Sequence, residues 1–142
     1  MGAAMLALTG SALAAQSVVR FDIAADLSAG DAGADIAGTS AMHYRCDSRV
    51  RISDRIWFER RATAADPWLR IEPDRVSYRP ARFADPRRPG GRVRRETVQA
   101  PRSSLAAAGS GDFRLRSRMT FACAGHRIVA RSETLPLPGI GA

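Results

Sequence analysis

The sequence predicts an all-β protein, a single antiparallel β-sandwich with one disulfide. Apolar and polar residues alternate in several segments, which is the period of a half-buried strand. Clusters of Pro, Gly and Asp separate these segments at short intervals, as is typical of turns between strands. A chain of 142 residues is about the size of one domain and can bury a core without a metal or cofactor. We therefore expect one domain and no cofactor.

About seven short strands account for most of the chain. The longest alternation runs over residues 42–52, and the clearest one over residues 113–123. Residues 27–40 are rich in Gly, Ala and Asp, and we expect them to form a surface loop. A calcium site is not expected in this loop, because no Glu closes it at the spacing of a cation loop. The other strand candidates lie at residues 19–23, around Trp57, and at 67–72, 75–78, 92–98 and 126–135.

Residues 1–14 are interpreted as a signal peptide that is cut after Ala14. Residues 3–8 are apolar, and residues 12–14 have the small-x-small pattern of a signal peptidase site. The apolar run is shorter than the ~18–20 residues that a transmembrane helix needs. No basic residue opens the segment, which fits a translation start further upstream; the alternative is a flexible Ala-rich tail. The sequence thus predicts a periplasmic or secreted protein with its single domain at residues 15–142.

The two cysteines are each accompanied by a histidine, in "HYRC" and "CAGH". Cys46 and Cys123 share the phase of the apolar residues in their strands, so both are expected to point into the core. Two buried cysteines of an exported protein are expected to form a disulfide. The alternative is a metal site made of His43, Cys46, Cys123 and His126. In a regular strand His43 faces away from Cys46, which disfavours this alternative.

The order Cys46, Trp57 and Phe121-x-Cys123 resembles that of immunoglobulin-type sandwiches, over about residues 21–135. The resemblance implies a buried Trp that packs against an inter-sheet disulfide. We therefore expect Trp57, which stands between Ile56 and Phe58, to be more buried than Trp68, which follows a turn. Phe121 replaces the corner Tyr of such sandwiches and lacks its hydroxyl. Such a resemblance concerns the architecture and does not give a function.

The charge is strongly basic: 22 basic residues stand against 14 acidic ones, for a net charge of +8, and every basic residue is Arg. A GC-rich genome can explain the preference for Arg over Lys, but not the net charge. Residues 87–95 are expected to form a mobile basic tip of a hairpin that binds an anion; the alternative is a solvated loop. A second row, Arg114, Arg116 and Arg118, is expected to pair with acidic residues of a neighbouring strand. The tip's candidate anion-binding residues are Arg87, Arg88, Arg92, Arg94 and Arg95.

The sequence contains none of the common catalytic or phosphate-binding motifs, and we expect no enzymatic activity. We expect a non-catalytic binding or accessory protein of a bacterial-type envelope. Its partner would be an acidic protein, a lipid headgroup or a polysaccharide. One alternative is a cytoplasmic nucleic-acid-binding protein, although the basic stretches contain almost no aromatic residues for base stacking. The other alternative is a small periplasmic protein that binds a metal through the Cys/His set.

Overall fold

The computed structural model describes residues 21–124 and 128–140 of the chain. The predicted signal peptide, residues 1–14, and His126 lie outside the described residues. The described part consists of strands and one five-residue helix, α2. The elements are β1 (Phe21–Ala32), β2 (Asp35–Cys46), β3 (Val50–Arg61), β4 (Leu69–Ile71), β5 (Ser77–Ala84), β6 (Arg92–Pro101), α2 (Arg102–Ala106), β7 (Asp112–Cys123) and β8 (Ile128–Pro136).

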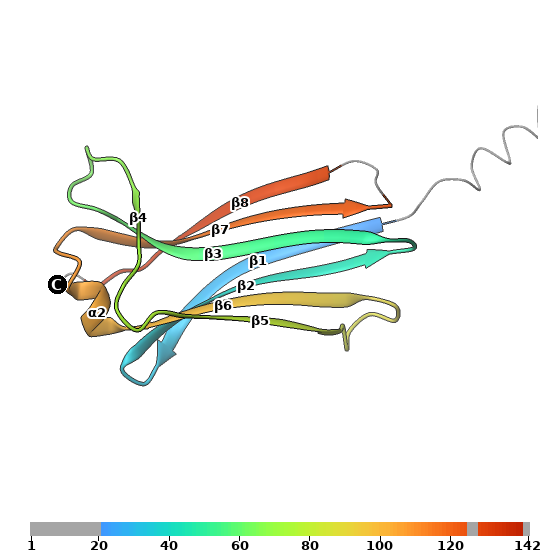
Figure 1. Cartoon of the computed structure of the whole chain (residues 1–142), viewed down its shortest axis with the longest axis horizontal. Coiled ribbons are helices and arrows are strands. Elements are labelled where there is room, and N and C mark those ends of the chain that lie inside the picture. The colour runs from blue at the N-terminus through green and yellow to red at the C-terminus, as the bar shows by residue number, and fades with distance from the viewer. Residues whose placement is uncertain (1–20, 125–127, 141–142) are drawn as a thin grey trace, which may run out of the picture.

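The strands form two antiparallel sheets of four strands each. Sheet A has the order β1-β2-β6-β5, and sheet B has the order β4-β3-β7-β8. The sheets lie face to face, with β3 close to β6 and β1 close to β8 (Figure 1). The predicted antiparallel β-sandwich is therefore confirmed. The described residues contain no helix that is long and apolar enough to cross a membrane.

The predicted disulfide is confirmed, and it connects the two sheets. Cys46 ends β2 in sheet A, Cys123 ends β7 in sheet B, and their Cα atoms are 5.9 Å apart. Next to the bond, Met42, Tyr44 and Phe121 form a small apolar cluster. A larger cluster fills the other end of the sandwich and includes Ile56, Phe58, Val98, Leu105, Phe113 and Leu115. The helix α2 contributes Leu105 to this second cluster.

The expected surface loop at residues 27–40 is wrong, because these residues form a long hairpin. The strands β1 and β2 pair from Phe21↔Cys46 to Ala32↔Asp35, and two residues connect them. Gly33 adopts a φ of +68° in this turn, which glycine reaches at no steric cost. Small residues are weak strand formers, but here they let the sheets approach closely. A Cβ atom on Gly38 would lie 2.4 Å from Leu115 Cδ1.

The expected burial of Trp57 against the disulfide is also wrong. In β3 the inward positions are Asp54, Ile56 and Phe58, so Trp57 points to the outer face of sheet B. Its side chain is half-buried, as is that of Trp68. The immunoglobulin-type spacing therefore places the disulfide correctly but not the tryptophan.

Candidate anion-binding site

The predicted basic tip comprises a hydrogen-bonded turn between β5 and β6 and the first residues of β6. Asp85 is buried at its start, and one of its carboxylate oxygens accepts a hydrogen bond from the backbone N–H of Arg87 at 2.9 Å. The other oxygen lies 3.2 Å from Nδ1 of His43 on β2. The backbone hydrogen bond from Arg87, aided by His43, lowers the pKa of Asp85. The backbone N–H of Asp85 closes the turn by donating to the carbonyl of Gly91 at 2.9 Å.

The five arginines of this tip do not share one surface. Arg94 points between the sheets, where its Nη2 lies 3.4 Å from Glu96 Oε1. Arg95 points to the outer face of sheet A, with its guanidinium 4.9 Å from the ring centre of Phe83. Arg87 and Arg92 are exposed, and Arg88 is half-buried. Arg94 is thus removed from the predicted set, and anion binding by the other four stays a prediction.

The row on β7 behaves differently from the expected cross-strand pairing. Arg114 pairs with Glu59 on β3, with Nε 2.8 Å from Oε1, as the sequence predicts. Arg116 and Arg118 instead face Trp57 and Arg55 across the same strand pair. Within residues 21–124 and 128–140, neither of these two arginines has an ion-pair partner.

A cleft of about 420 Å³ lies on the outer face of sheet B, over β3, β7 and β8. We call it the Arg–Trp cleft. It is lined by Trp57, Glu59, Arg70, Arg116, Arg118, Ala130, Arg131 and Ser132. Arg131 comes from β8, and like Arg116 and Arg118 it has no acidic partner in the described part of the chain. Arg116 and Arg118 therefore bring two guanidinium groups without a carboxylate partner to this cleft, and Arg131 borders it from β8, at the position opposite Met119.

Glu59 is the only carboxylate among the residues that line the cleft, and both of its oxygens already accept hydrogen bonds. It is 6% exposed, and one oxygen accepts the hydrogen bond from Arg114. The other oxygen accepts the indole N–H of Trp57 at 2.9 Å, which fixes the orientation of that ring. Arg70 lies 5.4 Å from the ring centre of Trp57 and is itself paired with Glu72 at 2.9 Å. The cleft thus presents a fixed aromatic ring beside unpaired arginines.

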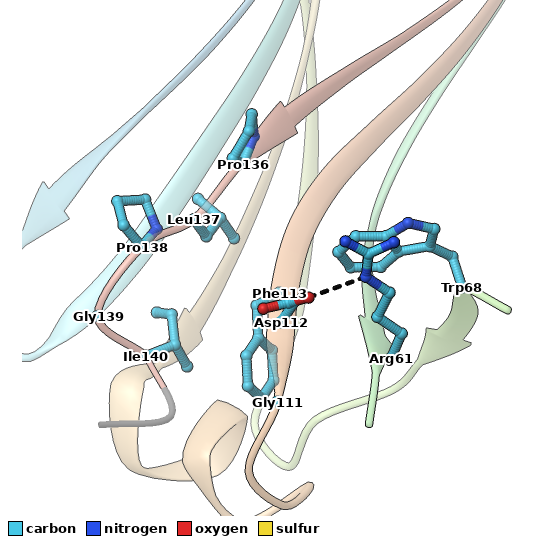
Figure 2. Close-up of a pocket in the computed structure, with 10 residues that line it drawn as sticks. All are labelled: Arg61, Trp68, Gly111, Asp112, Phe113, Pro136, Leu137, Pro138, Gly139 and Ile140. Carbon is cyan, nitrogen blue, oxygen red and sulfur yellow. Dashed lines mark hydrogen bonds and ion pairs between the residues drawn. The ribbon is translucent and has the colours of Figure 1, made fainter. Parts of the chain in front are cut away.

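A second cavity, of about 610 Å³, lies at the end of sheet B where the segment after β8 crosses Phe113 (Figure 2). Trp68 stands at its edge and contacts two arginines, with Arg61 and Arg114 at 4.5 and 4.2 Å from its ring centre. Figure 2 shows the hydrogen bond from Arg61 to Asp112, which measures 2.9 Å. Both arginines therefore have carboxylate partners, and this cavity lacks the free positive charge of the Arg–Trp cleft.

The alternative metal site is not assembled in the described residues. The sulfurs of Cys46 and Cys123 are joined to each other, so neither is available as a thiolate ligand. His43 lies on the outer face of sheet A and contacts Asp85, away from the disulfide. No group of three or more His, Cys, Asp or Glu residues in residues 21–124 and 128–140 is arranged to hold a metal ion.

Comparison of the chain with protein families, with curated proteins and with solved structures finds no match. The fold and the surface chemistry are therefore the basis for a functional proposal.

Proposed function

We propose that this protein is an exported, non-catalytic binding protein of a bacterial-type envelope, and that the Arg–Trp cleft binds an anionic partner. The observation that carries the proposal is the presence of Arg116 and Arg118 in one cleft without a free carboxylate, with Arg131 at its border. Like charges on neighbouring strands repel one another, so an anion that enters the cleft relieves this repulsion. Arginine is suited to this role because its planar fork donates two parallel hydrogen bonds to phosphate, sulfate or carboxylate.

The aromatic ring adds a second mode of contact. Trp57 is half-buried, and its N–H is already bonded to Glu59, so the ring contributes through its apolar surface. A sugar ring or an acyl chain can pack on such a surface while its anionic group contacts the arginines. This combination favours a phosphorylated or sulfated polysaccharide or an anionic lipid headgroup. An acidic protein would use the charges alone.

Two observations support the proposal that the protein is exported. The disulfide between Cys46 and Cys123 fits an oxidising environment, where such bonds form and persist. The apolar leader at residues 1–14 fits export. Fractionation of a tagged protein with its natural start tests this part of the proposal. We expect recovery outside the cytoplasm without free thiols, and recovery of reduced protein in the cytosol would contradict it.

Three defined probes separate the classes of partner. Dextran sulfate represents an anionic polysaccharide, vesicles with phosphatidylglycerol represent an anionic membrane, and a single-stranded oligonucleotide represents nucleic acid. We expect binding to dextran sulfate or to the vesicles at 0.1 M salt and its loss near 1 M. The reason is that the Debye length falls from ~10 to ~3 Å over this range. Preference for the oligonucleotide over both other probes would instead support the nucleic-acid alternative.

A further inference from the structure

The sandwich is open along one side, because β4 is much shorter than the strand that it borders. The strand β3 pairs with β7 over its whole length, but with β4 only at residues 58–60. Its other edge, over residues 50–57, has no strand neighbour in the described part of the chain. Figure 1 shows β4 at one end of the sandwich only. An unpaired edge of this kind presents free backbone N–H and C=O groups that another strand can bind.

The inner face of sheet A is also exposed across from this free edge of β3. The strands β4 and β5 are the corresponding edges of the two sheets, and a longer β4 would cover the inner face of β5. Instead, the inward positions Tyr78, Pro80 and Arg82 are exposed, and the side chain of Tyr78 is 40% exposed. The free edge of β3 and the inner face of β5 therefore border an open groove, which we call the β3–β5 groove.

A buried carboxylate lies in this groove and lacks one hydrogen-bond partner. Asp54 is 5% exposed, and Ser40 donates to its Oδ1 at 3.0 Å. Its Oδ2 atom is buried without a partner in the described residues. Asp54 lines a cavity of about 230 Å³, together with Ile56, Trp57, Arg55, Arg70, Tyr78 and Glu96. A buried carboxylate oxygen without a donor is costly, and a ligand that supplies one removes that cost.

The charges around Asp54 favour a cation as that donor. Glu96 and Arg94 are the charged groups that act on Asp54, and Arg94 is paired with Glu96 at 3.4 Å. Of the two other arginines at the cavity, Arg70 is paired with Glu72, and Arg55 is exposed on β3. The charged groups that act on Asp54 are thus one further carboxylate and one arginine that is already paired with it. Burial raises the pKa of Asp54 to about 6, so the carboxylate is mostly ionised at neutral pH.

We propose that the β3–β5 groove binds an extended segment of a partner protein, which adds a strand to the free edge of β3 and places a Lys or Arg side chain against Asp54. Directly opposite residues on neighbouring strands have Cβ atoms about 4.5–5.5 Å apart, within reach of a salt bridge. The backbone of the segment supplies hydrogen bonds to β3, and its alternate side chains supply specificity. The residue two positions away, beside Ile56 and Tyr78, would be apolar.

Self-pairing of two β3 edges is disfavoured in the two registers that are centred on charged residues. Pairing centred on Asp54 sets it against its own copy, and pairing centred on Arg55 does the same to that residue. Like charges directly opposite are destabilising, so these two registers are disfavoured, whereas a Lys or Arg of a partner segment would complement Asp54.

A designed peptide tests this proposal on the intact, disulfide-bonded protein. The probe is an acetylated and amidated Thr-Val-Thr-Lys-Thr-Val-Thr, which places Val, Lys and Val on one face of a strand in either direction. The control probe has Glu in place of Lys. We expect the Lys probe to bind and to slow amide hydrogen exchange in residues 50–57, and the Glu probe to bind at least about tenfold more weakly. Equal binding of both probes, or protection of β1 or β8 instead of β3, would overturn the proposal.

The variant Asp54→Asn tests the carboxylate itself, since it keeps the shape and the acceptor for Ser40. We expect it to weaken binding of the Lys probe about tenfold. We also expect the wild-type protein to bind the Lys probe more weakly below pH 6, where Asp54 is protonated, and the variant to lack this pH dependence. Glu133→Gln on β8 is the charge-matched control and should bind like the wild type. An unchanged affinity in Asp54→Asn would refute the role of this carboxylate. Binding of dextran sulfate should be unaffected by Asp54→Asn, so failure here is distinguishable from failure of the Arg–Trp cleft.

Discussion

Trp57 on β3 stands directly opposite Arg116 on β7, on the outer face of sheet B. Both residues line the Arg–Trp cleft, and the ring of Trp57 is oriented by Glu59. Its position follows from the phase of β3, which turns Ile56 and Phe58 inward and Trp57 outward. The tryptophan therefore belongs to the outer surface of sheet B and not to the core.

Substitution of Trp57 and of its neighbour Phe58 should have clearly different effects on stability. Phe58 is fully buried, at 0% exposure, so Phe58→Ala should lower the free energy of unfolding by about 3–5 kcal/mol. Trp57→Ala should lower it by less, because the ring is half-buried on the outer face. Denaturant unfolding of both variants measures the difference. A larger loss in Trp57→Ala than in Phe58→Ala would mean that the tryptophan belongs to the core after all.

Removal of the disulfide should cost a large part of the protein's stability. The bond closes a loop of 77 residues, which corresponds to roughly 4 kcal/mol in the chain-entropy model. The paired variant Cys46→Ala/Cys123→Ala should lower the free energy of unfolding by about this amount. Thiol labelling of the denatured wild-type protein should find no free cysteine before reduction. Two labelled cysteines in that experiment would disprove the bond.

The stability of the protein should depend on the ionisation of Asp54. Its pKa rises from its ordinary value of 3.8 to about 6 in the folded protein, chiefly because of burial. The folded state thus binds this proton more tightly than the unfolded state does, so the contribution of Asp54 to stability falls as the pH rises from about 4 to about 6. The total change corresponds to about 3 kcal/mol at most.

Other acids titrate in the same range, so the comparison with Asp54→Asn isolates this effect. The pKa of Asp85 is lowered, for example, and its contribution has the opposite sign. We expect the wild type to lose stability relative to Asp54→Asn between pH 4 and pH 6. Urea unfolding at several pH values measures this difference. Parallel stability curves for the two proteins would show that Asp54 has an ordinary pKa.

The alternation of residues was sufficient to predict the sandwich, the disulfide and the outward row on β7. It failed at residues 27–40, where strand pairing overrides the weak strand preference of Gly, Ala and Asp. It also failed at Trp57, because apolar residues on both sides of the tryptophan conceal the phase of β3. The phase is visible only when Asp54 is recognised as an inward residue, and a buried carboxylate is not expected from a pattern.

The Arg–Trp cleft could not be predicted from the sequence, because its composition depends on which strands are neighbours. The pairing of Arg114 with Glu59 and the placement of Trp57 opposite Arg116 join residues that are distant in the sequence. The five arginines of residues 87–95 are close together in the sequence, and this spacing predicts one basic surface. The turn and the two faces of β6 disperse them, with Arg94 inward and Arg95 outward.

Two variants that lose the same charge test most directly whether the Arg–Trp cleft is the anion-binding site. The cleft variant replaces Arg116, Arg118 and Arg131 by Ser, and the hairpin variant replaces Arg87, Arg92 and Arg95 by Ser. The measurement is the dissociation constant for dextran sulfate at 0.1 M salt, with thermal melting as a check of folding. We predict that the cleft variant loses at least about tenfold more affinity than the hairpin variant, because charge-assisted hydrogen bonds are lost in addition to net charge. Equal losses in both variants, or a larger loss in the hairpin variant, would contradict the assignment.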